Sequence, residues 1–292
     1  MKTFPFLEIA TQGKNTFWHY AFSLSFILGS WIFLGSAVAA ALLLFQASAD
    51  ASAAFTFEIN TPLAFSAFML SFVPWLAATL IAVRWVHRRP IRTLITAAPR
   101  PRLRRIAQGF GYWLILMILA SLVEAWLYRG RYTLSFPPEW WRFLLPALIL
   151  IPIQTSTEEV FFRGYLLQAL GLKIRNLPLL ILLSGFFFAL PHIFNPEVSV
   201  SFWPVMGSYF LTGAFTAWIT LRDGGLELAL GMHAANNLYA LIANYPNSAI
   251  NIPSIFAIRE LDAVYGLIAQ IIACVIFFWL VFRPRRAQDE RI

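Results

Sequence analysis

Long apolar runs separated by short polar segments dominate this chain. The runs fall at about 17–46, 63–84, 109–128, 143–170, 178–194, 203–221, 225–243 and 263–282. Most have the length of roughly 20 residues with which an α-helix crosses a hydrocarbon core. Backbone N–H and C=O groups find no hydrogen-bond partners in lipid, and a helix pairs them internally. The pattern therefore predicts an all-α fold: a polytopic membrane helical bundle of about eight transmembrane helices.

Composition agrees with that class and excludes others. Hydrophobic residues make up 59% of the chain and charged residues only 12%, against about 25% charged in soluble domains. No stretch is polar enough for a soluble module, so residues 1–292 are expected to form a single integral membrane domain. The net charge of +8 comes from arginines and lysines that flank the apolar runs. Because they are not interleaved with exposed aromatic residues, the basic balance does not indicate nucleic-acid binding.

The distribution of lysine and arginine predicts the orientation in the bilayer. Seventeen of them lie in the N-terminal arm, in alternate loops and in the C-terminal tail, whereas four lie on the other side. Cytoplasmic loops carry the excess of basic residues in membrane proteins. We therefore expect both termini in the cytoplasm, and an even number of helices agrees because it places both termini on the same side. The expected location is a bacterial plasma membrane.

Three charged residues interrupt the run at 143–170. Each of Glu158, Glu159 and Arg163 costs about 2.5–3.5 kcal/mol near a bilayer centre. Residues four apart share a helix face, whereas neighbours point about 100° apart. Glu159 is thus expected to pair with Arg163 as a structural clamp, leaving Glu158 to face the interior as a candidate base. A single buried ion network that only holds helices together is the alternative.

Two further helices supply polar partners for Glu158. Phe188 and His192 lie four residues apart on one, and His233 and Asn237 lie four apart on another. At 1.5 Å per residue, Glu158 and His192 are both about 20 Å from the cytoplasmic ends of their helices, and His233 is roughly 12 Å in. Convergence of these side chains on one site explains them better than isolated packing roles do. Glu124 and Glu227, near helix ends, are expected to be structural or interfacial charges, and Asn236 to bond a neighbouring helix.

These residues carry a family resemblance. The segments Glu158-Glu159-Val-Phe-Phe-Arg163, Phe188-Ala-Leu-Pro-His192 and His233-Ala-Ala-Asn-Asn237 resemble the EExxxR, FxxxH and HxxxN signatures of the CPBP intramembrane proteases, the CAAX prenyl endopeptidase and bacteriocin-processing (Abi) family. The three occur in order within residues 143–243, the expected catalytic core.

The resemblance implies roles for the motif residues. Glu158 and His192 would hold and activate a water, His233 and Asn237 would stabilise the oxyanion, and Glu159 with Arg163 would complete the site. The implied substrate is a membrane-associated protein or peptide, lipidated in some members of the family. Zinc is an open question, because Glu158, His192 and His233 match a common three-ligand set. An asparagine paired with His233 suits an oxyanion better, and no cofactor is favoured.

Two other functions fit an intramembrane cluster of charges. One is a bacteriocin-immunity or self-protection protein that keeps the fold without turnover. The other is a transporter whose buried charges mark an ion path. The combination of base, water partner and oxyanion donors favours an endopeptidase over both.

Overall fold

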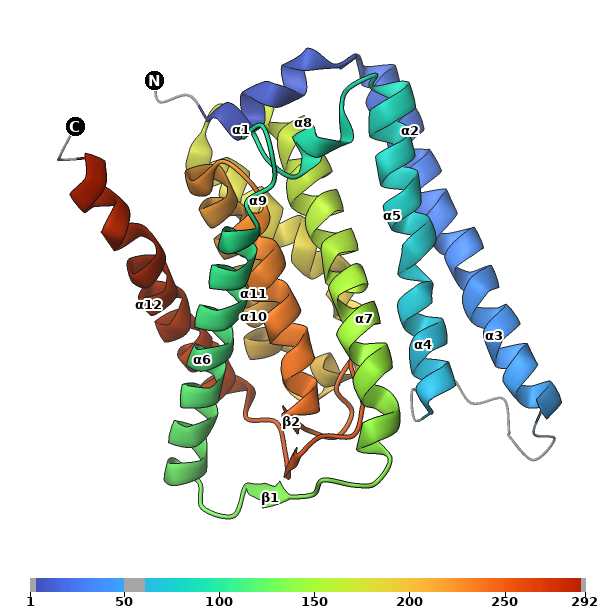
Figure 1. The fold of residues 1–292 in the computed structure, drawn as a ribbon, viewed down its shortest axis with the longest axis vertical. Helices are drawn as coiled ribbons and strands as arrows, with labels where there is room; N and C mark the ends of the chain where they lie inside the picture. Colours follow the sequence, from blue (N-terminus) through green and yellow to red (C-terminus); the bar gives the residue numbers. More distant parts are fainter. Residues whose placement is uncertain (1–3, 50–60, 290–292) are drawn as a thin grey trace.

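The computed structural model describes residues 4–49 and 61–289. Its α-helices are α1 (Pro5–Glu8), α2 (Phe17–Gly29), α3 (Ser36–Ala49), α4 (Pro62–Leu70), α5 (Phe72–Ile81), α6 (Leu103–Leu127), α7 (Trp140–Glu159), α8 (Leu167–Gly171), α9 (Leu177–Ala189), α10 (Phe202–Asp223), α11 (Glu227–Leu238) and α12 (Ala263–Asp289). The strands are β1 (Tyr132–Leu134), β2 (Ala243–Asn244) and β3 (Phe256–Ile258). The long helices run side by side, with both termini at one end and the strands at the other (Figure 1).

The expected membrane helical bundle is confirmed. Within the described residues, six helical stretches are long and apolar enough to cross a membrane: Phe17–Leu44, Pro62–Val86, Leu103–Leu127, Trp140–Gly171, Leu177–Phe194 and Ala263–Arg283. The other two predicted runs are also helical, as α10 and α11, but they fall outside this set. Helix α11 has only 12 residues, which is too short to cross alone. Large apolar side chains such as Trp18, Phe33 and Val275 are exposed, as lipid contact requires.

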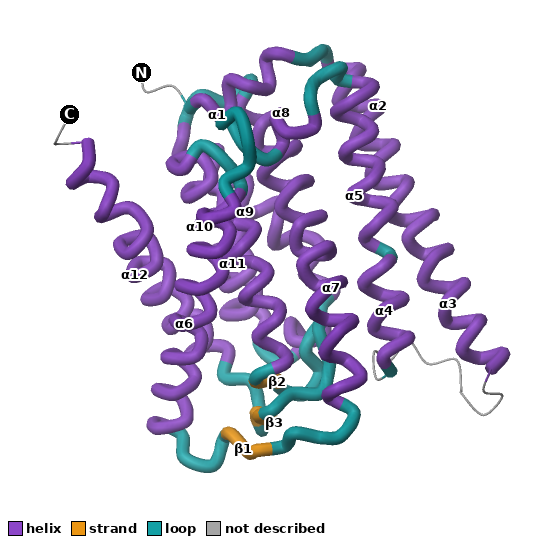
Figure 2. The backbone as a smooth tube through the Cα atoms, viewed as in Figure 1, coloured by secondary structure: helices purple, strands orange, loops and turns teal. Residues whose placement is uncertain are grey.

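The prediction that residues 225–243 form one helix is wrong at its end. Helix α11 stops at Leu238, a 3-10 turn follows, and β2 begins at Ala243. The strands form a small sheet of order β1-β3-β2, antiparallel between β1 and β3 and parallel between β2 and β3 (Figure 2). The Asn244 amide donates to the carbonyls of Ile250 and Ile252 and closes the loop. The apolar residues there are buried against protein, which hydrophobicity alone does not distinguish from lipid exposure.

Close backbone contact places α11 against α6. A Cβ on Gly231 would collide with the backbone of Ile106 and Phe110, and a Cβ on Gly109 would collide with the backbone of Leu228. Small residues at such crossings let membrane helices approach closely. This packing fixes the height of the His233 and Asn237 side chains in the bundle.

An ion network ties the start of α6 to the end of α10 and the start of α11, at the end of the bundle that carries the termini. Arg102 pairs with Asp223 at 2.8 Å and with Glu227 at 2.7 Å, and Arg105 pairs with Asp223 at 2.6 Å. The Glu227 side chain has no solvent exposure. Glu227 is therefore a structural charge, as the sequence suggested.

Departures from regular helix occur beside the motif residues. Asn176 caps α9 by accepting the Leu179 N–H at 3.0 Å, and the helix changes to a 3-10 turn over Leu190–Phe194. Pro191 lacks a backbone N–H and clashes with an α-helical turn, which explains this change beside His192.

Helix α7 continues through a π-helical segment into α8. The segment spans Val160–Leu166 and contains Arg163 of the charged motif. From the last residues of this segment onward, side chains contact the N-terminal part of the chain. Tyr165 hydroxyl lies 2.9 Å from His87 Nε2. The Gln168 amide donates to the carbonyls of Phe6 at 3.0 Å and Thr93 at 2.8 Å. The π-helical segment thus lies between the two glutamates and Gln168, and it carries both Arg163 and Tyr165 itself.

Candidate active site

The two adjacent glutamates face different surroundings. Glu158 lines a cavity of about 570 Å³, whereas Glu159 and Arg163 do not. Both glutamates are buried, with 6% and 0% of their surface exposed. The helical spacing that predicted separate positions for these carboxylates is thus borne out by their geometry.

Glu159 joins two cationic or potentially cationic side chains. Its Oε1 lies 3.1 Å from Arg163 Nη1 on the same helix and 2.8 Å from His233 Nδ1 on α11. The Arg163 guanidinium also stacks over the Phe188 ring of α9, 4.2 Å from its centroid. Glu159 and Arg163 therefore connect the three helices that carry the three motifs, and the contact with His233 was not foreseen from the sequence.

Glu158 is held by a glutamine one turn earlier on α7. Gln154 Nε2 donates to Glu158 Oε1 at 2.7 Å, and Asn237 Nδ2 donates to Gln154 Oε1 at 3.0 Å. The other carboxylate oxygen, Glu158 Oε2, lies 3.5 Å from His233 Nε2 and has no hydrogen bond from protein. One oxygen of Glu158 is thus fixed, and the other is left for a ligand or water.

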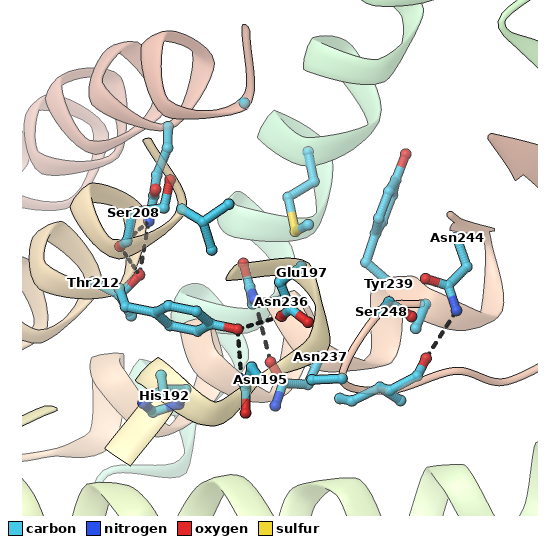
Figure 3. Close-up of a pocket in the computed structure, with 18 of the residues that line it drawn as sticks. His192, Asn195, Glu197, Ser208, Thr212, Asn236, Asn237, Tyr239, Asn244 and Ser248 are labelled. Carbon is cyan, nitrogen blue, oxygen red and sulfur yellow. Dashed lines mark hydrogen bonds between the residues drawn. The ribbon is translucent and has the colours of Figure 1, made fainter. Parts of the chain in front are cut away.

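His192 faces the same cavity from the 3-10 turn that follows α9 (Figure 3). Its Nδ1 lies 2.7 Å from the Phe188 carbonyl. A carbonyl oxygen only accepts, so Nδ1 carries the hydrogen and Nε2 of the neutral ring is an acceptor. The ring also lies 4.2 Å from that of Tyr209, centroid to centroid. No hydrogen bond joins His192 to Glu158 in the described part of the chain, but both side chains line the same cavity.

The predicted convergence is therefore present in the structure. Glu158, Glu159, Arg163, His233 and Asn237 form one polar cluster connected through Gln154, and His192 lines the same cavity as part of this cluster. Sequence reasoning missed many polar residues of the same cavity, among them Gln154, Asn195, Glu197 and Tyr209. For Gln154 a signal existed, since an amide four residues before Glu158 in an apolar run shares its helix face.

The secondary polar residues also have defined partners. Asn236 Oδ1 accepts from Trp113 Nε1 of α6 at 3.2 Å, which confirms the expected bond to a neighbouring helix. Glu124 pairs with Arg131 at 2.9 Å and accepts from the Tyr132 hydroxyl at 2.6 Å. Glu124 is thus a structural charge that also lines the far part of the cavity.

The residues considered as zinc ligands are not gathered as a metal site. Across the described residues, no group of three or more His, Cys, Asp and Glu side chains is arranged to hold a metal ion. His233 uses Nδ1 to contact Glu159, and its Nε2 faces Glu158. The donor set does not fit a three-ligand zinc centre in this arrangement, and we derive no chemical step through a metal.

Comparisons with known proteins bear on this site directly. A family model described as type II CAAX prenyl endopeptidase Rce1-like matches residues 137–239, the segment that contains all three motifs. The chain is also 34% identical over 294 residues to the uncharacterized protein YyaK of Bacillus subtilis (strain 168), covering 95% of this chain and 97% of the relative. This chain belongs to the Rce1-like type II CAAX prenyl endopeptidase family. No solved structure matches it. Membership of this Rce1-like family and six apolar helices identify an integral membrane protein of a protease family.

The position of Gln154 leads to a first prediction. In Gln154→Met, Glu158 Oε1 loses its donor and Asn237 loses its acceptor. A hydrogen bond to a charged group contributes about 1.5–3 kcal/mol, so we expect the rate of peptide-bond cleavage to fall about 10- to 100-fold. This rate is measured with the purified protein and a membrane substrate that it cleaves. Gln270→Met is the matched control, since Gln270 lines the cavity but bonds Thr212 and Ser208 instead. An equal loss of cleavage rate in both variants would contradict the role of Gln154 in holding Glu158.

Proposed function

We propose that this protein is an intramembrane endopeptidase that hydrolyses a peptide bond of a membrane-associated protein or peptide with Glu158 as the base. The observation that carries the proposal is the division between the glutamates. The Oε2 atoms of both glutamates lack a hydrogen bond from the protein, but Glu159 is occupied through Oε1 by Arg163 and His233, whereas Glu158 lines a cavity that is also lined by His192, His233 and Asn237.

In this proposal one water is held between Glu158 and His192. Glu158 Oε2 accepts one hydrogen of the water, and His192 Nε2 accepts the other. Attack of the water oxygen on the scissile carbonyl forms the new C–O bond, and the proton passes to Glu158. A positioned base of this kind contributes typically 10²–10⁴-fold to the rate.

The oxyanion that forms is expected to face α11. An amide nitrogen carries two hydrogens; Asn237 Nδ2 donates one to Gln154 and has a second to give. His233 Nδ1 is engaged by Glu159, so donation from Nε2 requires a doubly protonated ring, whose charge is balanced by the neighbouring carboxylates. Donors aimed at a developing charge are worth about 3–4 kcal/mol in an apolar site. Collapse of the intermediate then breaks the C–N bond, and Glu158 returns its proton to the leaving nitrogen.

The cavity suits an amphipathic substrate. One part is lined by aromatic residues of the N-terminal helices, including Trp31, Phe72 and Trp75. The polar part reaches Asn244 and Ser248, near the end of the molecule that carries the strands. We therefore propose that an apolar or lipidated segment lies along the aromatic wall while the scissile bond lies beside Glu158.

Comparison of membrane-protein termini tests this function. Cells expressing the intact protein and the Glu158→Gln variant at equal levels are compared by mass spectrometry of new N- and C-termini. We expect termini that are present only with the intact protein, and they identify the substrates. Identical termini in the two samples, at equal abundance of folded protein, would contradict an endopeptidase.

The proposed chemistry also predicts independence from metal. We expect purified active protein to keep its cleavage rate within about twofold after dialysis against a strong chelator, because Glu158 and His192 themselves polarise the water. Elemental analysis of the same sample is expected to show far less than one metal ion per chain. Loss of activity on chelation, restored by zinc, would contradict this route and replace it with metal-assisted hydrolysis.

A further inference from the structure

The cavity is lined by five acidic residues and, within the described residues, by no lysine or arginine; its potentially cationic side chains are those of His192 and His233. The five carboxylates are those of Glu124, Glu158, Glu197, Glu260 and Asp262. Arg131, outside the lining, pairs with Glu124 at 2.9 Å and Asp262 at 3.0 Å. Glu260 is largely exposed to solvent. Three of the five charges are thus either compensated or solvated, and Glu158 is engaged by the site already described.

Glu197 is different from the other four. It is buried, with 5% of its surface exposed, and lies in the short turn Pro196–Ser199 after α9. Its Oε1 accepts a hydrogen bond from the Tyr209 hydroxyl, but its Oε2 has no partner in the protein. No lysine, arginine or histidine of the described residues forms an ion pair with it. A buried carboxylate without a cation is costly and is usually paired or neutralised.

Tyr209 places this carboxylate beside the reaction centre. The ring of Tyr209 lies 4.2 Å from that of His192, centroid to centroid, while its hydroxyl donates to Glu197 and accepts from Asn195 at 2.7 Å. Dashed lines in Figure 3 mark the hydrogen bonds at Glu197 and Asn195. A group bound to Glu197 Oε2 therefore lies one tyrosine side chain away from the proposed water partner.

We propose that Glu197 forms a subsite for a positively charged side chain, lysine or arginine, next to the scissile bond of the substrate. The cation would pair with the unpartnered Oε2 and supply the charge that the protein lacks there. The lining holds five acidic residues and no lysine or arginine of the described residues, so the preferred substrate is a bond near a basic residue. This inference rests on the proposed endopeptidase function, because it names the substrate class of the same site.

Binding to inactive protein tests the subsite without relying on turnover. The probes are N-dodecanoyl hexa-alanine amides with a single lysine moved through the six positions, with norleucine and acetyl-lysine versions of each. They are titrated against the Glu158→Gln protein in neutral detergent. With the substituted residue at one position or at two adjacent ones, we expect the lysine peptide to bind about tenfold or more tightly than the norleucine peptide, as for a buried charge pair. Adding Glu197→Gln should abolish that preference and leave the affinity of the norleucine peptide unchanged.

The proposal would be overturned by no preference for lysine at any position, by a preference that survives Glu197→Gln, or by one that disappears instead with Glu260→Gln. Equal gains from acetyl-lysine and lysine would indicate hydrogen bonding to a neutral carboxyl and would also overturn it. The active protein is then given the same peptides. Lysine-dependent binding without any cleavage counts against the proposed function alone, whereas equal cleavage of lysine and norleucine peptides counts against the subsite alone.

Discussion

Glu158→Gln is expected to lower the rate of peptide-bond cleavage by about 10²–10⁴-fold, the usual contribution of a positioned general base. The substitution keeps the shape of the side chain and can still bond Gln154, but an amide does not take a proton from water. Glu158 forms no direct ion pair with Arg163, so the bundle should stay folded. Cleavage rates of purified protein, together with thermal unfolding in detergent, measure both effects.

Glu139→Gln is the matched control for this substitution. Glu139 is exposed and precedes the same helix, α7, so its replacement tests the charge change without touching the cavity. We expect it to keep full activity. Turnover by Glu158→Gln at a rate close to that of the control would refute the assignment of Glu158 as the base.

Glu159→Gln is expected to act on stability first. It removes the acidic partner of Arg163, whose guanidinium has no solvent exposure and pairs with no other acid in the described part of the chain. Breaking a buried pair by removing one partner costs about 3–5 kcal/mol. We therefore expect the free energy of unfolding to fall by that amount, while folded Glu159→Gln protein retains more activity than Glu158→Gln. Chemical unfolding in mixed micelles and rates per folded molecule provide the two readouts.

A double-mutant cycle separates the pair from its surroundings. Arg163→Met alone leaves Glu159 buried with only His233, and should also destabilise the protein. The double variant Glu159→Gln, Arg163→Met removes both charges and should be more stable than the sum of the single effects predicts. If Glu158→Gln and Glu159→Gln instead abolish activity to the same extent at the same stability, the division of roles between the two glutamates is wrong.

Periodicity within single helices made the core of the site predictable. The four-residue spacing from Glu159 to Arg163 correctly predicted their ion pair, and the spacing in Phe188–His192 and His233–Asn237 correctly grouped side chains on shared faces. These are local relations, set by the geometry of one helix. The bundle class was predictable for a similar reason, since lipid leaves the backbone few alternatives to helix.

Relations between distant segments were not predictable in the same way. The contact from His233 to Glu159 joins residues 74 positions apart, and its existence depends on how closely α11 approaches its neighbours. The end of α11 was misplaced because Leu241 and Ala243 are apolar through burial in protein, not through contact with lipid. Glu197 lies in a turn outside every apolar run, so nothing in the sequence marked it as buried.

The π-helical segment at Val160–Leu166 has a consequence for how this family can change in evolution. A π-helical turn accommodates one residue more than an α-helical turn, so loss of one residue here would yield an ordinary helix of similar hydrophobicity. It would also rotate Tyr165 and Gln168 by about 100° relative to Glu158, separating the charged motif from the N-terminal anchors. A deletion between Glu159 and Arg163 would also shorten the EExxxR spacing, whereas a deletion at Gly164 would keep the motif but lose its alignment with the rest of the protein. Single-residue length changes in this segment should therefore be rare among functional members.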